Sequence, residues 1–158
     1  MAPETSRLTR RIALLAFAAN GDVPMAEIEV ELRNIAGTEA ALGWAGAHTI
    51  VVDRPEGRAG GKGLGFNGGQ LLALALGGCF CNDLRYAAHA TGVKLGAIAV
   101  NVTLDLAGEP LLATAATIHV ECDTLDGSDP QAVIAEAERI STVSNSLKAG
   151  VPVRVRAS

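Results

Sequence analysis

The sequence predicts an α+β protein with the element order βββ-α-ββ-α-β. Three observations predict this class: several segments alternate apolar and polar residues, one long segment is rich in leucine and alanine, and a shorter helical segment comes near the end. The strands come in runs and do not alternate strictly with helices. A chain of 158 residues has the length of one domain.

Composition excludes several function classes. Apolar residues make up 49% of the chain, charged residues 19%, and the net charge is −4, a balance typical of a folded protein. One Trp, one Tyr and three Phe, with an acidic charge balance, provide neither a stacking platform nor a basic surface for nucleic acid. Every apolar run is far shorter than the roughly 20 residues that span a bilayer. We therefore expect neither a nucleic-acid nor a membrane partner.

The first 25 residues lack the periodicity of a helix or strand. We expect a disordered arm, or a true start at Met25, with the folded domain at 26–158 and residues 1–24 dispensable. A signal peptide is the alternative, because arginines precede a short apolar run at 12–19. Three cysteines are too few for a disulfide scaffold, which favours a reducing, cytoplasmic compartment.

Three short strands are predicted next. In residues 26–33 the side chains Ile28, Val30 and Leu32 alternate with charged residues, the pattern of a strand with one wet face. Residues 39–44 and 47–53 complete an antiparallel meander. The glycine-rich segment 54–69 that follows is either a mobile loop or a backbone held close to another part of the protein.

A long helix is predicted over residues 70–91, because Gly92 is a natural stop signal. The first half of this helix is apolar on all sides, so it must be covered on all sides. We expect its own sheet and a second subunit to cover it, which predicts a homodimer.

The last third of the chain contains a predicted hairpin and a second helix. Residues 98–104 and 112–120 alternate as two paired strands. Asp129 is the predicted N-cap of a helix with Pro130 at its first position, ending near residue 140. A polar turn over 141–146 and a closing strand at 151–155 are predicted to follow.

The chemistry centres on Cys79 in the long helix. At helical spacing Cys79 shares a stripe with Asn82, Asp83 and Tyr86, so the thiol lies where the apolar face turns polar. This position suits the floor of a pocket, with those three residues as candidate binding residues. The alternative is an inert, buried thiol. Cys81 lies roughly 200° round the helix and Cys122 ends a strand, so both are expected to pack.

Other known motifs are weak or missing. The sequence at 63–68 matches G-x-G-x-x-G, but no strand runs directly into it and no acidic residue follows at the required distance. The chain has no C-x-x-C, H-E-x-x-H or G-x-S-x-G motif, and its three histidines are scattered. We expect no metal and no cofactor.

Three segments carry a resemblance to a known family: WAGAHTIVVDRPEG, GGKGLGFNGGQLLALALGGCF and AERISTVSNSLKAGVPVRV. They resemble the OsmC/Ohr family of osmotically inducible and organic-hydroperoxide-resistance proteins. The resemblance implies an intertwined homodimer with the central helices inside. It also implies reduction of organic hydroperoxides by the Cys79 thiolate.

The chain departs from the peroxidase pattern of that family at several positions. The family's N-P-E-Q segment is matched by residues 67–70, so Gly69 replaces the glutamate while Gln70 is kept, and Ser141 replaces the second cysteine. These three positions join the candidate binding residues. No arginine aligns clearly with the family's thiolate partner, because Arg54 and Arg58 lie in a loop outside that motif.

The sequence and the resemblance together lead to two hypotheses for the function. The first is a single-cysteine peroxidase recycled by an external thiol, because serine cannot form the disulfide that resolves a sulfenic acid. The second is a non-catalytic module that binds a small apolar ligand in the cleft between subunits.

Overall fold

The computed structural model describes residues 26–157, so the expectations for residues 1–25 lie outside the described part of the chain. A three-stranded antiparallel sheet contains β1 (Glu31–Asn34), β2 (Ala41–Ala45) and β3 (His48–Val52), in that order. The long helix α1 (Gly68–Thr91) follows. The strands β4 (Leu95–Ala107) and β5 (Leu112–Thr124) form a long antiparallel hairpin, and α2 (Gln131–Ile140) and α3 (Thr142–Ala149) complete the described elements.

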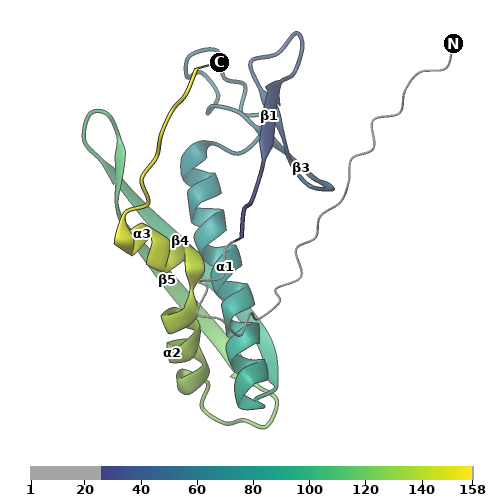
Figure 1. Ribbon diagram of the computed structural model, residues 1–158, viewed down its shortest axis with the longest axis vertical. Coiled ribbons are helices and arrows are strands. Elements are labelled where there is room, and N and C mark those ends of the chain that lie inside the picture. Colours follow the sequence, from purple (N-terminus) through teal and green to yellow (C-terminus); the bar gives the residue numbers. More distant parts are fainter. Residues whose placement is uncertain (1–25, 158) are drawn as a thin grey trace, which may run out of the picture.

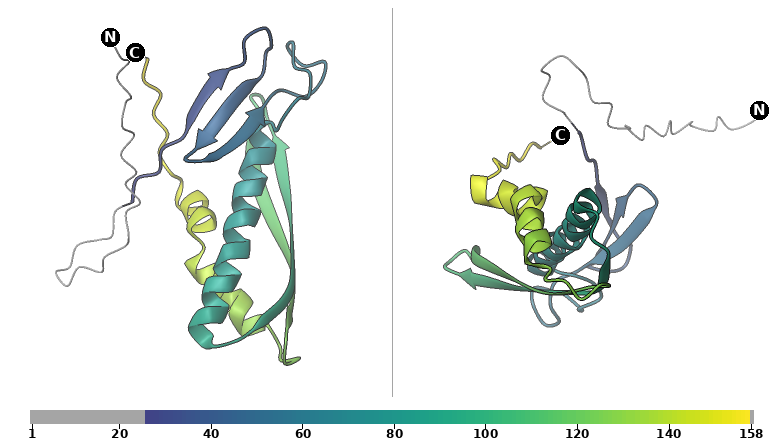
Figure 2. Two further views of the ribbon diagram at one scale, coloured as in Figure 1. Left: turned by 90° about the vertical axis from the view of Figure 1, so that its right-hand side faces the viewer. Right: turned by 90° about the horizontal axis from the view of Figure 1, so that it is seen from below.

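The predicted α+β class is confirmed, and the elements form two layers. The helix α1 lies along the β4–β5 hairpin, and α2 and α3 lie beside it on the same face (Figures 1 and 2). The small sheet sits at the end of the molecule where α1 begins. The helix α1 and the β4–β5 hairpin are the longest elements of the described chain, and α1 carries most of the candidate residues.

The core is small and is built mainly between α1 and α2. Phe80 and Leu84 of α1 pack with Val133 of α2 in a buried cluster that alanines of both helices complete. Half-buried residues of the hairpin, among them Ile118 and Val120, pack against this cluster. Burial of these side chains fixes the rotation of α1, because the helix must keep this face toward α2 and the hairpin.

The helix α1 begins two residues before the predicted start, at a cap that the sequence analysis did not identify, and ends at the predicted stop signal. Asn67 accepts a hydrogen bond from the backbone N–H of Gln70, whose side chain accepts one from the backbone N–H of Asn67, each at 3.0 Å. This reciprocal cap satisfies two of the N–H groups that a helix start leaves free. At the other end Gly92 adopts the left-handed conformation, with φ of 73°, as predicted.

Two predictions for the carboxyl-terminal third are wrong. The segment predicted as a polar turn forms the helix α3, in which Val143 and Leu147 lie at helical spacing and Gly150 supplies a left-handed cap. In residues 151–157 no strand is present among the described elements, and the side chains are exposed. The helix α2 also begins one residue late: Pro130 occupies the N-cap, although the Asp129 carboxylate still accepts the N–H of Gln131 at 3.0 Å.

The first predicted strand is shorter than expected. It pairs with β2 only from Glu31, while residues 26–30 are extended, unpaired and exposed. Ile28 is 88% exposed, whereas Val30 and Leu32 line a small apolar pocket beside Leu71. No helix within residues 26–157 is both long enough and apolar enough to cross a membrane.

Candidate functional site

The loop before α1 is anchored by one buried carboxylate. Asp53 follows β3 and accepts backbone N–H groups from Arg54, Lys62 and Leu64, at 2.8, 2.9 and 3.1 Å. Hydrogen bonds from the Leu64 and Lys62 amides lower the pKa of Asp53 below its ordinary value, because they stabilise the charged form. Sequence reasoning missed this residue. An acidic residue directly between a strand and a glycine-rich segment was the available signal.

The same loop approaches β3 closely. A β-carbon at Gly65 would lie 2.2 Å from the carbonyl oxygen of Val51, a distance that no side chain can accept. Phe66, next along the chain, forms an isolated parallel bridge with Val52. Of the two alternatives for the glycine-rich segment, the structure therefore shows a backbone held close to a neighbour. This contact sets where α1 starts.

Cys79 lies about three turns into α1 and is half-buried. Its Sγ donates a hydrogen bond to Oδ2 of Asp83, one turn further along, at 3.4 Å. The Asp83 side chain is almost fully covered, with 5% of the residue exposed. The Cys79 thiol is thus hydrogen-bonded to a buried carboxylate.

The remaining helix candidates are spread along α1. Asn82 and Tyr86 are exposed, with 66% of Tyr86 accessible, so they border Cys79 on the outer side of the helix. Gly69 and Gln70 lie in the first turn, ten and nine residues before Cys79. At about 1.5 Å of rise per residue they stand roughly 15 Å from the thiol along the helix axis. Within one chain the structure does not bring these two groups together.

Gly69 itself has room for a larger side chain. A β-carbon there would meet the Asn67 Oδ1 atom at 3.4 Å and the Leu106 Cδ1 atom at 3.7 Å, both ordinary contacts. Gln70 already uses its side chain in the cap of α1. A β-carbon at position 69, where the resemblance implies a glutamate, would therefore meet no clash.

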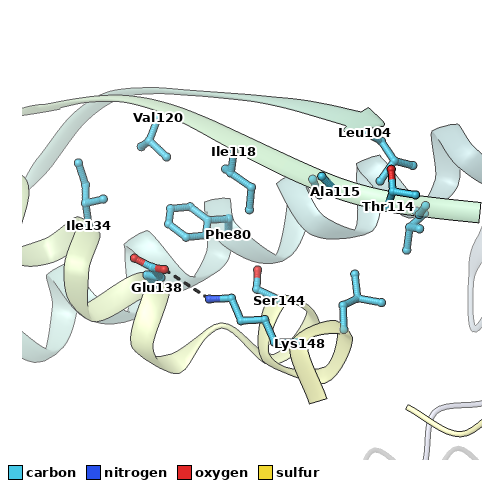
Figure 3. Close-up of a pocket in the computed structure, with 14 residues that line it drawn as sticks. Phe80, Leu104, Thr114, Ala115, Ile118, Val120, Ile134, Glu138, Ser144 and Lys148 are labelled. Atoms are coloured by element: carbon cyan, nitrogen blue, oxygen red, sulfur yellow. Dashed lines mark hydrogen bonds and ion pairs between the residues drawn. The ribbon is translucent and has the colours of Figure 1, made fainter. Parts of the chain in front are cut away.

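Ser141 is completely buried where α2 meets α3. Its hydroxyl donates to the hydroxyl of Ser144 at 3.2 Å. Ser144 in turn lines a cavity of about 560 Å³ between α1, the hairpin and α2–α3 (Figure 3). The serine in the place of the family's second cysteine is thus part of the packed wall behind this cavity.

The cavity is mainly apolar and was not predicted from the sequence. Phe80 points into it from α1, Ile118 and Val120 line it from β5, and Glu138 and Lys148 form an exposed ion pair at 3.4 Å along its edge (Figure 3). Phe80 lines this cavity, but the neighbouring Cys79 does not. The cavity can hold a small apolar molecule with a polar end.

The other two cysteines have different surroundings. Cys81 lines an apolar groove of about 460 Å³ between α1 and β4, with Phe66 and Leu74 among its neighbours. Burial raises the pKa of the Cys122 thiol, and the carboxylate of Asp123 raises it further. Among the described residues, neither thiol donates a hydrogen bond to a carboxylate or imidazole; Cys122 donates only to the carbonyl oxygen of Asp123, at 3.9 Å. Within residues 26–157, no cluster of three or more His, Cys, Asp or Glu side chains could hold a metal ion.

One family profile matches more than half of the chain. The profile described as "OsmC-like protein" matches residues 60–156. Curated proteins provide no match to the sequence.

Several solved structures share the fold. An OsmC-like protein of unknown function from Vibrio cholerae has a TM-score of 0.68 and 12% identity, over 77% of this chain and 94% of that one. An OsmC-like protein from Mycoplasma pneumoniae has a TM-score of 0.66 and 17% identity, over 79% and 89%. An organic hydroperoxide resistance protein OsmC from Legionella pneumophila has a TM-score of 0.59 and 17% identity, over 82% and 94%. At these identities the similarity establishes the fold alone.

Proposed function

Because the chain belongs to the OsmC-like protein family, we propose that it is a thiol-dependent peroxidase that reduces organic hydroperoxides at Cys79. The observation that carries the proposal is the hydrogen bond from the half-buried Cys79 thiol to the buried Asp83 carboxylate. A nucleophilic thiol needs a group that removes its proton. Proteins named for organic hydroperoxide resistance share the fold, which supports the same reaction class.

The proposed first half-reaction consumes the peroxide. The Cys79 sulfur attacks the terminal oxygen of ROOH, an S–O bond forms, and the O–O bond breaks. The thiol proton moves to Asp83 and from there to the departing alkoxide, which leaves as the alcohol ROH. The thiol and ROOH have then become a sulfenic acid and ROH, with all atoms accounted for.

The second half-reaction needs an external thiol, because Ser141 cannot form an internal disulfide. A thiol R′SH attacks the sulfur of the sulfenic acid, water leaves, and a mixed disulfide forms. A second R′SH releases the Cys79 thiol and the disulfide R′S–SR′. A reducing compartment such as the cytoplasm would supply that thiol.

We propose that the active form is a homodimer. In a single chain the outer side of α1 exposes Leu74, at 53%, together with Ala75 and Gly78. An apolar helix face with small residues of this kind is covered in a stable protein. A second copy would cover it and would exclude water from the region beside Cys79. Light scattering at micromolar concentration should give twice the mass of the chain, and a folded monomer would contradict this part of the proposal.

One assay tests the peroxidase. Consumption of cumene hydroperoxide is measured with dithiothreitol, dihydrolipoamide or glutathione as the reductant. Cys79→Ser should abolish turnover, whereas Cys81→Ser and Cys122→Ser are matched controls that should retain it. Mass spectrometry after stoichiometric peroxide should find added oxygen on Cys79 alone. A folded protein whose Cys79 stays reduced in several equivalents of peroxide would refute the proposal.

The cavity behind Ser144 favours a second candidate, a module that binds a small apolar ligand without catalysis. In that case Asp83 keeps the proton on Cys79 instead of removing it. Medium-chain fatty acids should then raise the melting temperature of the protein. Ala115→Trp, which fills the cavity from the hairpin, should remove the effect, because Ala115 lines the cavity. No shift with any chain length would leave the peroxidase as the only candidate.

A further inference from the structure

The cavity between α1, the hairpin and the helices α2 and α3 has a cause in the sequence of β5. The side chains of β5 that pack against the core cluster are large, namely Ile118 and Val120. Nearer the start of the strand, the residues that line the cavity include Ala113, Ala115 and Ala116. These small side chains leave the space open. Its volume of about 560 Å³ lies within the range of roughly 300–1,000 Å³ that is usual for small-molecule sites.

The cavity lies away from the face of α1 that the proposed homodimer covers. Leu72 and Phe80 line the cavity from α1, whereas Leu74 is exposed on the outer side of the helix. Successive residues of a helix turn by about 100°, so Leu72 and Leu74 point in directions roughly 200° apart. Cys79 does not line the cavity either. A ligand in the cavity therefore occupies a site separate from the thiol and from the proposed dimer face.

Two hydrogen-bond donors reach the cavity from one face of α3. Ser144 and Lys148 are one helical turn apart, and both line the cavity. Ser144 is only 8% exposed, and its hydroxyl accepts a hydrogen bond from Ser141 at 3.2 Å. Within residues 26–157, no acceptor is found for the proton of the Ser144 hydroxyl itself. Figure 3 shows the Ser144 oxygen pointing from α3 toward the hairpin, so this buried donor is available to a ligand.

The second donor has a partner that a ligand can replace. The Nζ atom of Lys148 lies 3.4 Å from Oε1 of Glu138, which belongs to α2 (Figure 3). Both side chains are largely exposed. An exposed ion pair of this kind contributes little, because water screens the charges and two long side chains must be held in place. A carboxylate that enters the cavity can therefore take the place of Glu138 beside the ammonium group.

We propose that this cavity binds a medium-chain monocarboxylic acid, with the carboxylate between Ser144 and Lys148 and the aliphatic chain along Phe80 and the alanines of β5. The inference deepens the second candidate function, because it names the group at the polar end of the ligand. The two donors one turn apart match the two oxygens of a carboxylate, and hydrogen bonds to an ionised oxygen are stronger than neutral ones. A protonated amine does not fit, because it cannot accept the Ser144 proton and would meet the Lys148 charge.

A series of ligands tests the chain and the head group separately. Isothermal titration calorimetry of the full chain measures Kd for hexanoate, octanoate and decanoate, and for methyl decanoate. Each added methylene should tighten binding about fourfold until the cavity is filled. Decanoate should bind about tenfold or more tightly than its methyl ester, which has the same chain but no charge. Equal Kd values for acid and ester would overturn the carboxylate site and leave the apolar module intact. Absence of binding by all four would overturn both.

The two partners of the ion pair should have opposite effects on the binding of decanoate. Lys148→Met keeps the length of the side chain and removes its charge, so Kd should rise about tenfold. Glu138→Gln removes the competing carboxylate, so Kd should fall about threefold. Neither change should alter the Kd of the methyl ester. A pair that only stabilised the fold would shift Kd in the same direction in both variants, and that result would overturn the proposal.

A neighbouring ion pair provides the matched control. Arg139 and Glu136 are also paired on α2, and neither residue lines the cavity. Arg139→Met and Glu136→Gln make the same changes in net charge and should leave the Kd of decanoate unchanged. Equal shifts in these variants would mean a general attraction to charge and would overturn the site. Peroxide turnover of the unchanged protein is measured separately, so the carboxylate site and the peroxidase depend on different results.

Discussion

Replacing Asp83 with asparagine changes the one group that is placed to take the Cys79 proton. Asp83→Asn keeps the size and shape of the side chain and removes its negative charge and its basic oxygen. If Asp83 is the base, the peroxide reaction slows. General acid–base catalysis contributes about 10²–10⁴-fold to a rate.

The geometry sets the expected loss at the low end of that range. The distance between Cys79 Sγ and Asp83 Oδ2 is 3.4 Å, and sulfur is a weak hydrogen-bond donor. Because Cys79 is only half-buried, water can remove the thiol proton in part when the carboxylate is absent. We therefore expect kcat/KM for cumene hydroperoxide to fall about 100-fold, which corresponds to roughly 2.7 kcal/mol of transition-state stabilisation.

The assay is peroxide consumption under excess dithiol, with the rate of sulfenic acid formation measured in a single turnover. Asp105→Asn is the matched control, because Asp105 is an exposed residue of β4. Melting curves of both variants establish that they are folded. An unchanged or faster reaction in Asp83→Asn would refute the reasoning, because it would mean that the carboxylate holds the proton on the sulfur.

Three further predictions concern stability. Leu84→Ala should cost about 3 kcal/mol in urea unfolding, because Leu84 is fully buried in the core cluster between α1 and α2. Leu125→Ala at the surface should change stability by less than about 0.5 kcal/mol, and equal effects would contradict the assigned core. Gly65→Ala should lower the melting temperature sharply, because the new β-carbon would clash with the backbone of β3. Gly68→Ala is the control and should not lower it, because there is open space around position 68. An unchanged melting temperature in Gly65→Ala would mean that the loop is not held against β3. Folding lowers the pKa of Asp53 below its ordinary value of 3.8, so its contribution to stability is present above that value and is lost as the pH falls through the lowered pKa. The melting temperatures of the unchanged protein and of Asp53→Asn should therefore differ at pH 6 and converge in acid, and a difference that persists at pH 2 would contradict this role.

The sequence predicted those elements whose signals are local. The end of α1 was predicted because Gly92 acts through adjacent backbone groups, and the Asn67–Gln70 cap at its start is an equally local signal that the sequence analysis did not use. The hairpin was readable because alternation continues over two long segments. In contrast, α3 was missed because a polar eight-residue helix has only Val143 and Leu147 to indicate its period.

The candidate site was predicted only where it lies on one helix. Helical spacing placed Cys79 and Asp83 on one stripe, and the structure joins them by a hydrogen bond. The cavity could not be predicted, because it forms between side chains of five elements whose packing no local pattern encodes. Asp53 was missed for a similar reason, since its partners lie up to 11 residues away in an irregular loop.

The close approach of α1 to β4 has an evolutionary consequence. A β-carbon at Gly77 would lie 3.1 Å from Cγ2 of Val102, so a larger residue at 77 would push the helix away from the hairpin or turn it about its axis. Such a rotation would swing Cys79, half a turn further on, out of its present direction. We expect residue sizes at these two positions to vary inversely among related sequences, with a larger residue at 77 accompanied by a smaller one at 102. The pair would then preserve the orientation of the thiol while the residues around it diverge.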